Sequence, residues 1–309
     1  MRLLESKAEY IPQEEGLEGI YKQIELAGRT AYHSLDKITP DSAKDFVYKM
    51  IKSHHGAALE HGTIYLTMPY DPSYIEDPYS KFLYDRHNLF VITNYRVLQE
   101  HEWLEDLKYL CKPTEFHEKR YTMRFTCSRA IAQELTRHRT FSFLMESQRY
   151  INYSKERHGG EITFIKPSWL NIPTGIVYWH DGICWRVQQN ENNSMEWFSV
   201  KPQEGFSKEE AQVASTYFDA LSHAEKKYFF LLRENCQPQQ ARDVLPNATK
   251  TELIMTGFSS DWRHLMDLRL FGKTGAPHTD MVDLMQKAQK SMQEAGIWED
   301  IMSKHSKFE

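Results

Sequence analysis

Apolar residues recur along this chain with two different periods, and their alternation restricts the fold to a mixture of helices and strands. Residues 63–68 and 121–127 place an apolar side chain at every second position, which predicts two strands, each with one buried face. Residues 46–51 and 213–232 carry apolar side chains at helical spacing instead, and Asp41 is suited to cap the first of these helices. We therefore predict a mixed α/β (α+β) fold.

The second half of the chain contains this long helix and two further predicted helices. Ser207 and Glu210 form a capping box that opens the long helix. The apolar face of this helix is expected to consist of Val213, Phe218, Leu221, Tyr228 and Leu232. A helix carrying Trp262 and Leu265 follows, and the last helix is expected over about 280–302. Because no low-complexity linker or repeat divides these elements, residues 1–309 are expected to form a single domain.

Composition excludes some classes of protein without indicating a reaction. The 309 residues are 40% hydrophobic, with a net charge of −5 and a pI near 6.3, so the chain as a whole does not attract nucleic acid or acidic membranes. No stretch approaches the ~18 apolar residues of a membrane span. The N-terminal stretch MRLLESKAEYIPQEEG lacks the apolar segment of a signal peptide. We expect a cytoplasmic protein without a membrane partner.

The four cysteines do not suggest a metal or redox centre. Cys111, Cys127, Cys184 and Cys236 are scattered without a CxxC pair, so we predict no metal site and expect reduced thiols. Cys127 falls on the apolar side of the second predicted strand and is expected to behave as a small core residue.

A cluster of basic residues lies in the middle of the chain. Arg137, His138 and Arg139 are followed by seven other residues, then by Ser147 and then by Arg149. Guanidinium groups suit phosphate and the edges of heterocycles, which makes this cluster a candidate anion site. The preceding segment SRAIAQELTRHR has helical spacing, so the basic triplet is expected in the last turn of a short helix. Taken alone, the triplet could equally well only complement the carbonyl end of that helix.

The spacing of this motif resembles that of the flavin-dependent thymidylate synthases (ThyX), and RHRTFSFLMESQRY matches it from Arg137 through Tyr150. HHGAALEH at 54–61 is similar to the histidine-containing block of that family, and ARDVLPNATKTELIMTGFSSDWRHLMDLR at 241–269 is similar to its other long block. Weaker similarities lie near Arg29 and directly after the motif. The resemblance implies a single catalytic domain with a central, largely antiparallel sheet flanked by helices.

The resemblance also implies a reaction. Members of the family transfer a methylene group from methylenetetrahydrofolate to C5 of dUMP, and hydride from FAD, replenished from NADPH, completes the methyl group of dTMP. Their sites lie between the subunits of a homotetramer. The chain is therefore expected to be a methyltransferase, a flavoprotein of dTMP biosynthesis with FAD as cofactor, NADPH and methylenetetrahydrofolate as co-substrates, and dUMP as substrate.

Matching positions carry the expected roles, with Arg269 as the catalytic residue that activates the uracil ring. The expected dUMP-binding residues are Glu134, Arg137, Glu146, Ser147, Arg149, Arg242 and Arg269. The expected FAD-binding residues are His55, Glu60, Arg137, His138, Arg139 and His264. Ser147 is assigned to binding because no partner base is fixed by the sequence. Without the resemblance, Arg242 could pair with Asp243 and Arg269 could extend from a helix end.

Departures and insertions leave alternatives open. Leu144 and Met145 replace a polar pair, Phe258 stands where asparagine is usual, and Ser260 replaces an arginine, so an enzyme acting on a modified pyrimidine nucleotide is the alternative within the family. Outside it, the same residue types could bind single-stranded nucleic acid, or the chain could be a degenerate flavoprotein. Residues 69–120 and 171–204 are interpreted as insertions, the second forming a β-ribbon.

Overall fold

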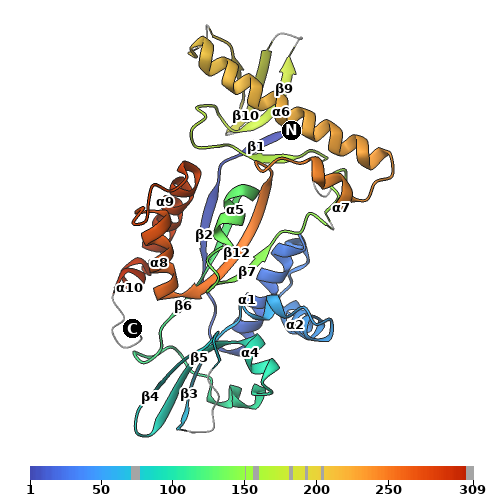
Figure 1. Cartoon of the computed structure of the whole chain (residues 1–309). Helices are drawn as coiled ribbons and strands as arrows, with labels where there is room; N and C mark the ends of the chain where they lie inside the picture. The colour runs from blue at the N-terminus through green and yellow to red at the C-terminus, as the bar shows by residue number, and fades with distance from the viewer. Residues whose placement is uncertain are drawn as a thin grey trace. The chain divides into compact units, whose positions relative to one another are not determined.

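The computed structural model describes residues 1–70, 77–149, 151–155, 160–180, 184–191, 194–202 and 205–303. The chain forms two compact units. Unit 1 consists of Met1–Ser6, Thr126–Gln133 and Ser147–Thr251, and unit 2 consists of Lys7–Phe125, Glu134–Glu146 and Glu252–Glu309. Both units combine helices with β-sheets, so the mixed α/β class is confirmed (Figure 1). The strand pairs with a described register are antiparallel, except for the parallel pair of Arg2–Leu4 with Thr163–Ile165. The assignment of all 309 residues to a single catalytic domain stays a prediction.

Unit 1 is built on a five-stranded sheet with the strand order β11-β10-β9-β1-β8. Its strands are β1 (Arg2–Leu4), β8 (Thr163–Ile165), β9 (Gly175–His180), β10 (Cys184–Glu191) and β11 (Ser194–Val200). β1 pairs parallel with β8, whereas β9, β10 and β11 form an antiparallel ribbon. This ribbon confirms the β-ribbon predicted within 171–204, whereas the interpretation of the segment as an insertion stays a prediction. The connections at 181–183 and 192–193 lie outside the described residues.

The long helix α6 (Lys208–Arg233) packs on this sheet, and α7 (Pro238–Ala241) and the short helix η4 (Arg242–Val244) follow it. The predicted capping box is present, because Ser207 and Glu210 exchange side-chain to backbone hydrogen bonds. Phe218 and its apolar neighbours are buried as expected, but Val213 is 50% exposed, so its assignment to the core was wrong. Its position lies off the helical stripe, and smaller alanines complete the buried face in its place.

Unit 2 contains two sheets. The four-stranded sheet has the order β2-β6-β12-β7, and the three-stranded sheet has the order β3-β5-β4. Their strands are β2 (Lys7–Ile11), β3 (Thr63–Pro69), β4 (Lys81–Tyr84), β5 (Asn88–Asn94), β6 (Arg120–Ser128), β7 (Ser142–Met145) and β12 (Lys250–Phe258). β4 and β5 belong to the predicted insertion at 69–120, whose residues 71–76 lie outside the described part of the chain.

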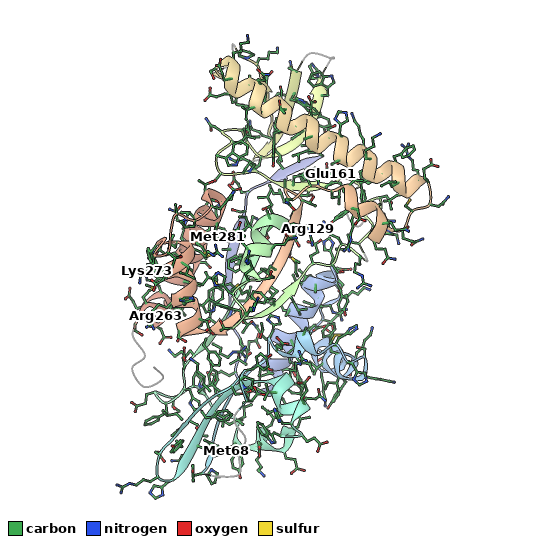
Figure 2. The ribbon with its side chains drawn as sticks, viewed as in Figure 1. Met68, Arg129, Glu161, Arg263, Lys273 and Met281 are labelled. Atoms are coloured by element: carbon green, nitrogen blue, oxygen red, sulfur yellow. The ribbon has the colours of Figure 1, made fainter. Side chains whose placement is uncertain are left out.

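Helices surround these two sheets. They are α1 (Gly16–Ala31), η1 (Leu35–Lys37), α2 (Ser42–Lys52), α3 (Gly56–Leu59), α4 (Tyr95–Glu100), η2 (Leu104–Tyr109), α8 (Ser259–Arg269), α9 (Thr279–Glu294) and α10 (Trp298–Met302). α9 lies along β2, and Met281 on it is completely buried (Figure 2). No helix in the described ranges is both long enough and apolar enough to span a bilayer.

Two strand predictions had different outcomes. β3 buries Ile64, Leu66 and Met68 on one face, as the alternation predicted. β6 was expected to bury only one face, but both of its faces are buried. Arg124 is the one residue of this strand that is only partly buried. Threonine hydroxyls can be buried when they are hydrogen-bonded, and Thr122 shares such a bond with Thr256 of β12 at 2.8 Å. Cys127 is buried as predicted, which raises the pKa of its thiol to about 12.

Two predicted helix ends were wrong. α5 (Arg129–Leu135) ends before the basic triplet, because the amides of Arg137 and His138 bond three residues back and the chain then turns into β7. The expected last helix is divided into α9 and α10, because Gly296 adopts a φ of +70° between them. α2 begins after Asp41 as predicted, but the Asp41 side chain makes no capping hydrogen bond.

Candidate functional site

The last turn of α8 brings together several of the predicted site residues. Arg269 Nε donates a 3.1 Å hydrogen bond to Nε2 of His138. A second nitrogen of the same guanidinium, Nη1, lies 3.6 Å from Oε2 of Glu134, near the end of α5. Because the two contacts engage two different nitrogens of the guanidinium, they fix its orientation, and neither of them uses Nη2.

His138 is electrically neutral in this arrangement. Burial, followed by the charges of Arg269 and His264, lowers the pKa of His138 to about 4. A neutral imidazole has one nitrogen with a lone pair, and the bond from Arg269 requires this nitrogen to be Nε2. The proton is therefore on Nδ1, and the ring is held as a neutral acceptor beside a permanent cation. His264 itself is exposed on α8.

A cavity of about 500 Å³ lies in the same unit. Its charged lining residues are Glu60, Asp77, Lys81, Arg96, Glu100, Arg120, Arg139 and Asp261. Phe258, Tyr79 and Phe141 add aromatic surface, and Asn94, Thr140 and Ser142 add neutral polar groups. A cavity of this volume with aromatic walls and a few converging polar groups is typical of a site for a small molecule or cofactor.

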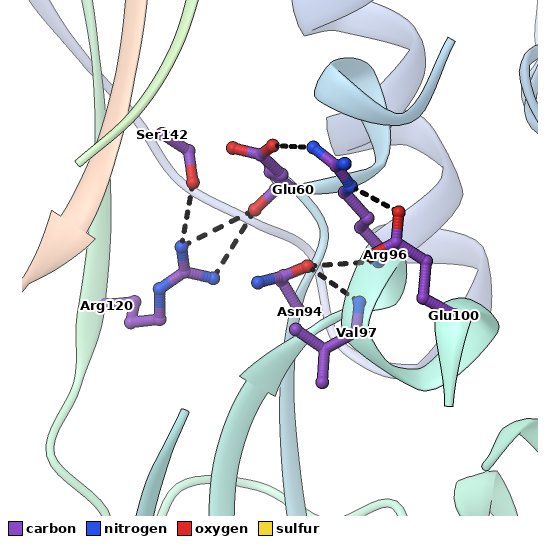
Figure 3. Close-up of polar contacts among 7 residues, drawn as sticks. All are labelled: Glu60, Asn94, Arg96, Val97, Glu100, Arg120 and Ser142. Carbon is purple, nitrogen blue, oxygen red and sulfur yellow. Dashed lines mark hydrogen bonds and ion pairs between the residues drawn. The ribbon is translucent and has the colours of Figure 1, made fainter. Parts of the chain in front are cut away.

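Glu60 joins two cations on one side of this cavity (Figure 3). Its carboxylate accepts a 2.6 Å hydrogen bond from Nη1 of Arg96, and Nε of Arg96 donates to Glu100 at 2.8 Å. The backbone carbonyl of Glu60 faces the guanidinium of Arg120 at 3.4 Å. Asn94 caps α4 by accepting hydrogen bonds from the amides of Arg96 and Val97, which fixes the start of the helix that carries Arg96.

A second ion pair involves another residue of the cavity lining. Lys81 of β4 pairs with the completely buried carboxylate of Glu118 and donates to Ser260 Oγ at 3.1 Å. Glu118 also accepts hydrogen bonds from the Ser259 hydroxyl at 3.1 Å and from the Ser260 amide at 2.8 Å. These contacts hold the pKa of Glu118 below its usual range even though burial opposes them. The ammonium of Lys81 lies 4.7 Å from the centre of the Phe258 ring.

The other predicted site residues of unit 2 do not line this cavity. His55 is exposed, and its Nδ1 shares a 2.6 Å hydrogen bond with the Tyr32 hydroxyl. Arg137 is exposed directly after α5. Glu146 is 3% exposed, its Oε2 accepts the amide of Glu252 at 3.2 Å, and its Oε1 lies 3.7 Å from His33 Nδ1.

Three predicted residues belong to unit 1 and are described within it. Ser147 is partly buried and Arg149 is exposed at the point where the chain enters this unit. Arg242 begins η4, and its Nε lies 4.0 Å from the carboxylate of its neighbour Asp243, so the local ion pair considered for it is at the distance limit. Tyr150, the last residue of the basic motif, lies outside the described residues.

Sequence reasoning missed the residues that give the cavity its charge. Lys81 and Arg120, which line the cavity, and Glu118, which pairs with Lys81, were not assigned a role, although all three belong to the segment interpreted as an insertion. Arg120 opens the predicted strand β6, where an arginine on a buried strand is unusual and could have been noticed. Lys81 offers no comparable signal, because lysine on a short strand is common at a sheet edge.

The family model of the thymidylate synthase complementing protein (Thy1) matches residues 90–295. A flavin-dependent thymidylate synthase of Corynebacterium aurimucosum is 24% identical over 303 residues, which cover 95% of this chain and 86% of that protein. The enzyme of the same name from Mycolicibacterium vanbaalenii is 23% identical and covers 84% of this chain and 71% of its own length. Among solved structures, the UMP/dUMP methylase PolB of Streptomyces cacaoi bound with 5-Br dUMP is 16% identical, with a TM-score of 0.42 over 100% of this chain and 96% of its own.

Proposed function

Because the chain belongs to the thymidylate synthase complementing protein family, we propose that it is a flavin-dependent thymidylate synthase, a methyltransferase that converts dUMP to dTMP. The observation that carries the proposal is the contact of Arg269 with His138 and Glu134, because all three residues fall within the matched range 90–295. An oriented guanidinium beside a neutral imidazole suits a site that must stabilise negative charge on a ring.

The described residues fit a flavin cofactor. The cavity lined by Arg139 and Arg120 has aromatic walls and cationic groups, and Arg120 keeps a buried Nε without a hydrogen-bond partner. Such a group is suited to a ligand that bears phosphate groups as well as a planar ring. Bound FAD would supply the hydride that completes the methyl group. We assign contacts with it to His55, Glu60, Arg137, His138, Arg139 and His264.

In the proposed mechanism, Arg269 acts on the uracil ring. Its contacts with His138 and Glu134 leave Nη2 and the second hydrogen of Nη1 free to donate to the N3 and O2 region of the base. Donation there stabilises the negative charge that develops as C5 becomes nucleophilic. Neutral His138 keeps the guanidinium oriented without adding a second positive charge that would repel it.

The other assignments in this proposal come from the family resemblance. dUMP binding is assigned to Glu134, Arg137, Glu146, Ser147, Arg149, Arg242 and Arg269. The buried contacts of Glu146 with His33 and Glu252 are compatible with a role in holding β7 beside β12. Methylenetetrahydrofolate as methylene donor, NADPH as reductant, a homotetramer and a cytoplasmic location belong to the same proposal.

The deciding experiment is a dTMP-formation assay with FAD, NADPH, methylenetetrahydrofolate and dUMP, in which each component is omitted in turn. The proposal expects dTMP only from the complete mixture and a yellow protein with flavin absorbance bands. UMP and dCMP serve as alternative substrates, and product from one of them but not from dUMP would favour a modified nucleotide. A protein that binds no FAD at tens of micromolar concentration would contradict the proposal, and light scattering tests the tetramer.

A further inference from the structure

Arg120 is a buried cation whose contacts within the chain are weak. Its side chain is 9% exposed. Nη1 lies 3.4 Å from each of three acceptors, which are Glu60 O, Thr63 Oγ1 and Thr93 O. Nη2 lies 3.5 Å from Glu60 O and 3.4 Å from Ser142 Oγ. These distances are at the outer limit for hydrogen bonds, and Nε has no hydrogen-bond partner in the part of the chain that the structure describes.

No carboxylate in the described residues lies within ion-pair distance of Arg120. The carboxylates that act on it electrostatically are those of Asp261 and Glu60. Asp261 accepts a hydrogen bond from the amide of Phe258 at 3.1 Å, and the Glu60 carboxylate is engaged by Arg96. The Phe258 ring, 5.4 Å from the guanidinium carbon, offers only a cation–π contact. A buried charge that is left without an anion is costly, so the site is incomplete as it stands.

Arg139 adds a second uncompensated cation to the same cavity. It is exposed, lines the cavity with Arg120, and forms no ion pair with another described residue. The other two cations of the lining are neutralised, since Lys81 pairs with Glu118 and Arg96 pairs with two glutamates. We propose that the cavity bounded by β4, β5 and β12 binds a phosphate group between Arg120 and Arg139, and that Arg120 is a ligand-binding residue.

The proposal gives the segment 69–120 a function. Residues of β4 and β5 line the cavity, and Arg120 lies at the end of the segment, where β6 begins after α4 and η2. Lys81 of this segment anchors the start of α8 through Glu118 and Ser260, which holds Phe258 against the Arg120 side chain. The segment therefore supplies part of a binding site and does not merely enlarge the surface.

Two ligands of the proposed reaction carry suitable phosphates: the diphosphate of FAD and the 5′-phosphate of dUMP. Naming these two sources rests on the proposed function, whereas the phosphate chemistry rests on Arg120 and Arg139 alone. Arginine forms paired, charge-assisted hydrogen bonds with phosphate oxygens, each stronger than a neutral hydrogen bond. Removing one such partner is expected to weaken binding on the order of 10- to 100-fold.

The test compares the full-length wild-type protein with Arg120→Met and Arg124→Met. Arg124 lies on the same strand, outside the cavity, and is paired with Glu252 at 3.2 Å, so the second variant is a matched control. Isothermal titration measures the affinities for inorganic pyrophosphate, FAD and dUMP, and riboflavin serves as the phosphate-free probe. Circular dichroism melting checks that each variant is folded.

We expect Arg120→Met to lose pyrophosphate affinity together with the affinity for either FAD or dUMP, while riboflavin binding and the Arg124→Met control stay within about twofold of wild type. Whichever nucleotide loses affinity is the source of the phosphate. Unchanged phosphate affinities, or an equal loss for riboflavin, would overturn the proposal. If Arg120→Met does not fold, Arg139→Met carries the same expectations, because Arg139 is exposed and its replacement should not affect folding. Pyrophosphate binding that depends on Arg120 would support the site even if no dTMP were formed.

Discussion

Replacing Arg269 by lysine separates a role in turnover from a role in holding the protein together. The guanidinium reaches His138 at 3.1 Å with one nitrogen and Glu134 at 3.6 Å with another. Lysine keeps the positive charge but presents a single ammonium on a flexible stem, so it cannot maintain both contacts and still address two atoms of a base. Arg269→Lys should therefore impair the chemical step far more than it impairs folding or flavin binding.

The expected magnitudes differ enough to be measured. Losing an oriented donor for developing negative charge costs roughly 2.7 to 4 kcal/mol, or a hundred- to thousandfold in rate. The hydrogen bond to His138 contributes about 1 kcal/mol to stability. The pair with Glu134 is partly exposed, so after solvent screening it contributes well under ~1 kcal/mol. Disturbing His138 should accordingly lower FAD affinity no more than about tenfold.

Single-turnover oxidation of prereduced enzyme by dUMP and methylenetetrahydrofolate measures the chemical step, and fluorescence titration of the same variant measures FAD affinity. Arg263→Lys is the matched control, because Arg263 lies on the same helix and donates to the carbonyl of Ser303 at 2.8 Å. The control should retain the wild-type rate. A near-wild-type rate in Arg269→Lys would remove Arg269 from the mechanism and direct attention to Arg149 and Arg242.

Three further predictions concern stability. Burial lowers the pKa of His61 to about 3, so between pH 6.5 and pH 3 only the unfolded chain binds this proton. Stability should fall by up to about 1.4 kcal/mol per pH unit as the pH is lowered, and urea unfolding of His61→Gln should show a shallower decline. Gly257→Ala places a Cβ 2.4 Å from the Phe141 ring and should cost about 1 to 3 kcal/mol in thermal unfolding. Glu118→Gln leaves Lys81 without its buried partner and should cost roughly 3 to 5 kcal/mol, most of which a Glu118→Leu, Lys81→Met double variant should recover in urea titrations.

Local patterns predicted the elements well where one physical effect dominated. The capping box at Ser207 and the alternation at 63–68 each depend on a few neighbouring residues, and both were confirmed. The end of α5 was misplaced because the basic triplet has acceptable helical propensity, and only the need to turn into β7 ends the helix earlier. The break between α9 and α10 was not predicted, because one glycine within a helical pattern is tolerated and the positive φ of Gly296 is visible only in the structure.

The sequence motifs identified residues of the candidate site but not their contacts or charge states. The motif and the end of α8 were both noticed, and the structure brings His138, Glu134 and Arg269 into contact across separations of more than a hundred residues. The sequence could not reveal the neutral state of His138, because its lowered pKa arises from burial and from a cation on another helix. Charge states of this kind depend on tertiary packing.

Phe258 and Ser260 show how a departure from a motif can be compensated in space. These positions lack the asparagine and the arginine that the resemblance leads one to expect, which suggests a weaker anion site. In the structure, however, Lys81 lies 4.7 Å from the Phe258 ring and donates to Ser260, and Arg120 lies 5.4 Å from the same ring. The electrostatic potential at a point depends on every charge near it, irrespective of the position of that charge in the sequence. The charge of Lys81 is offset by Glu118, so Arg120 is the residue that replaces the positive charge missing from position 260, from more than a hundred positions earlier in the sequence. The loss of one motif residue therefore does not by itself imply a loss of affinity for an anion.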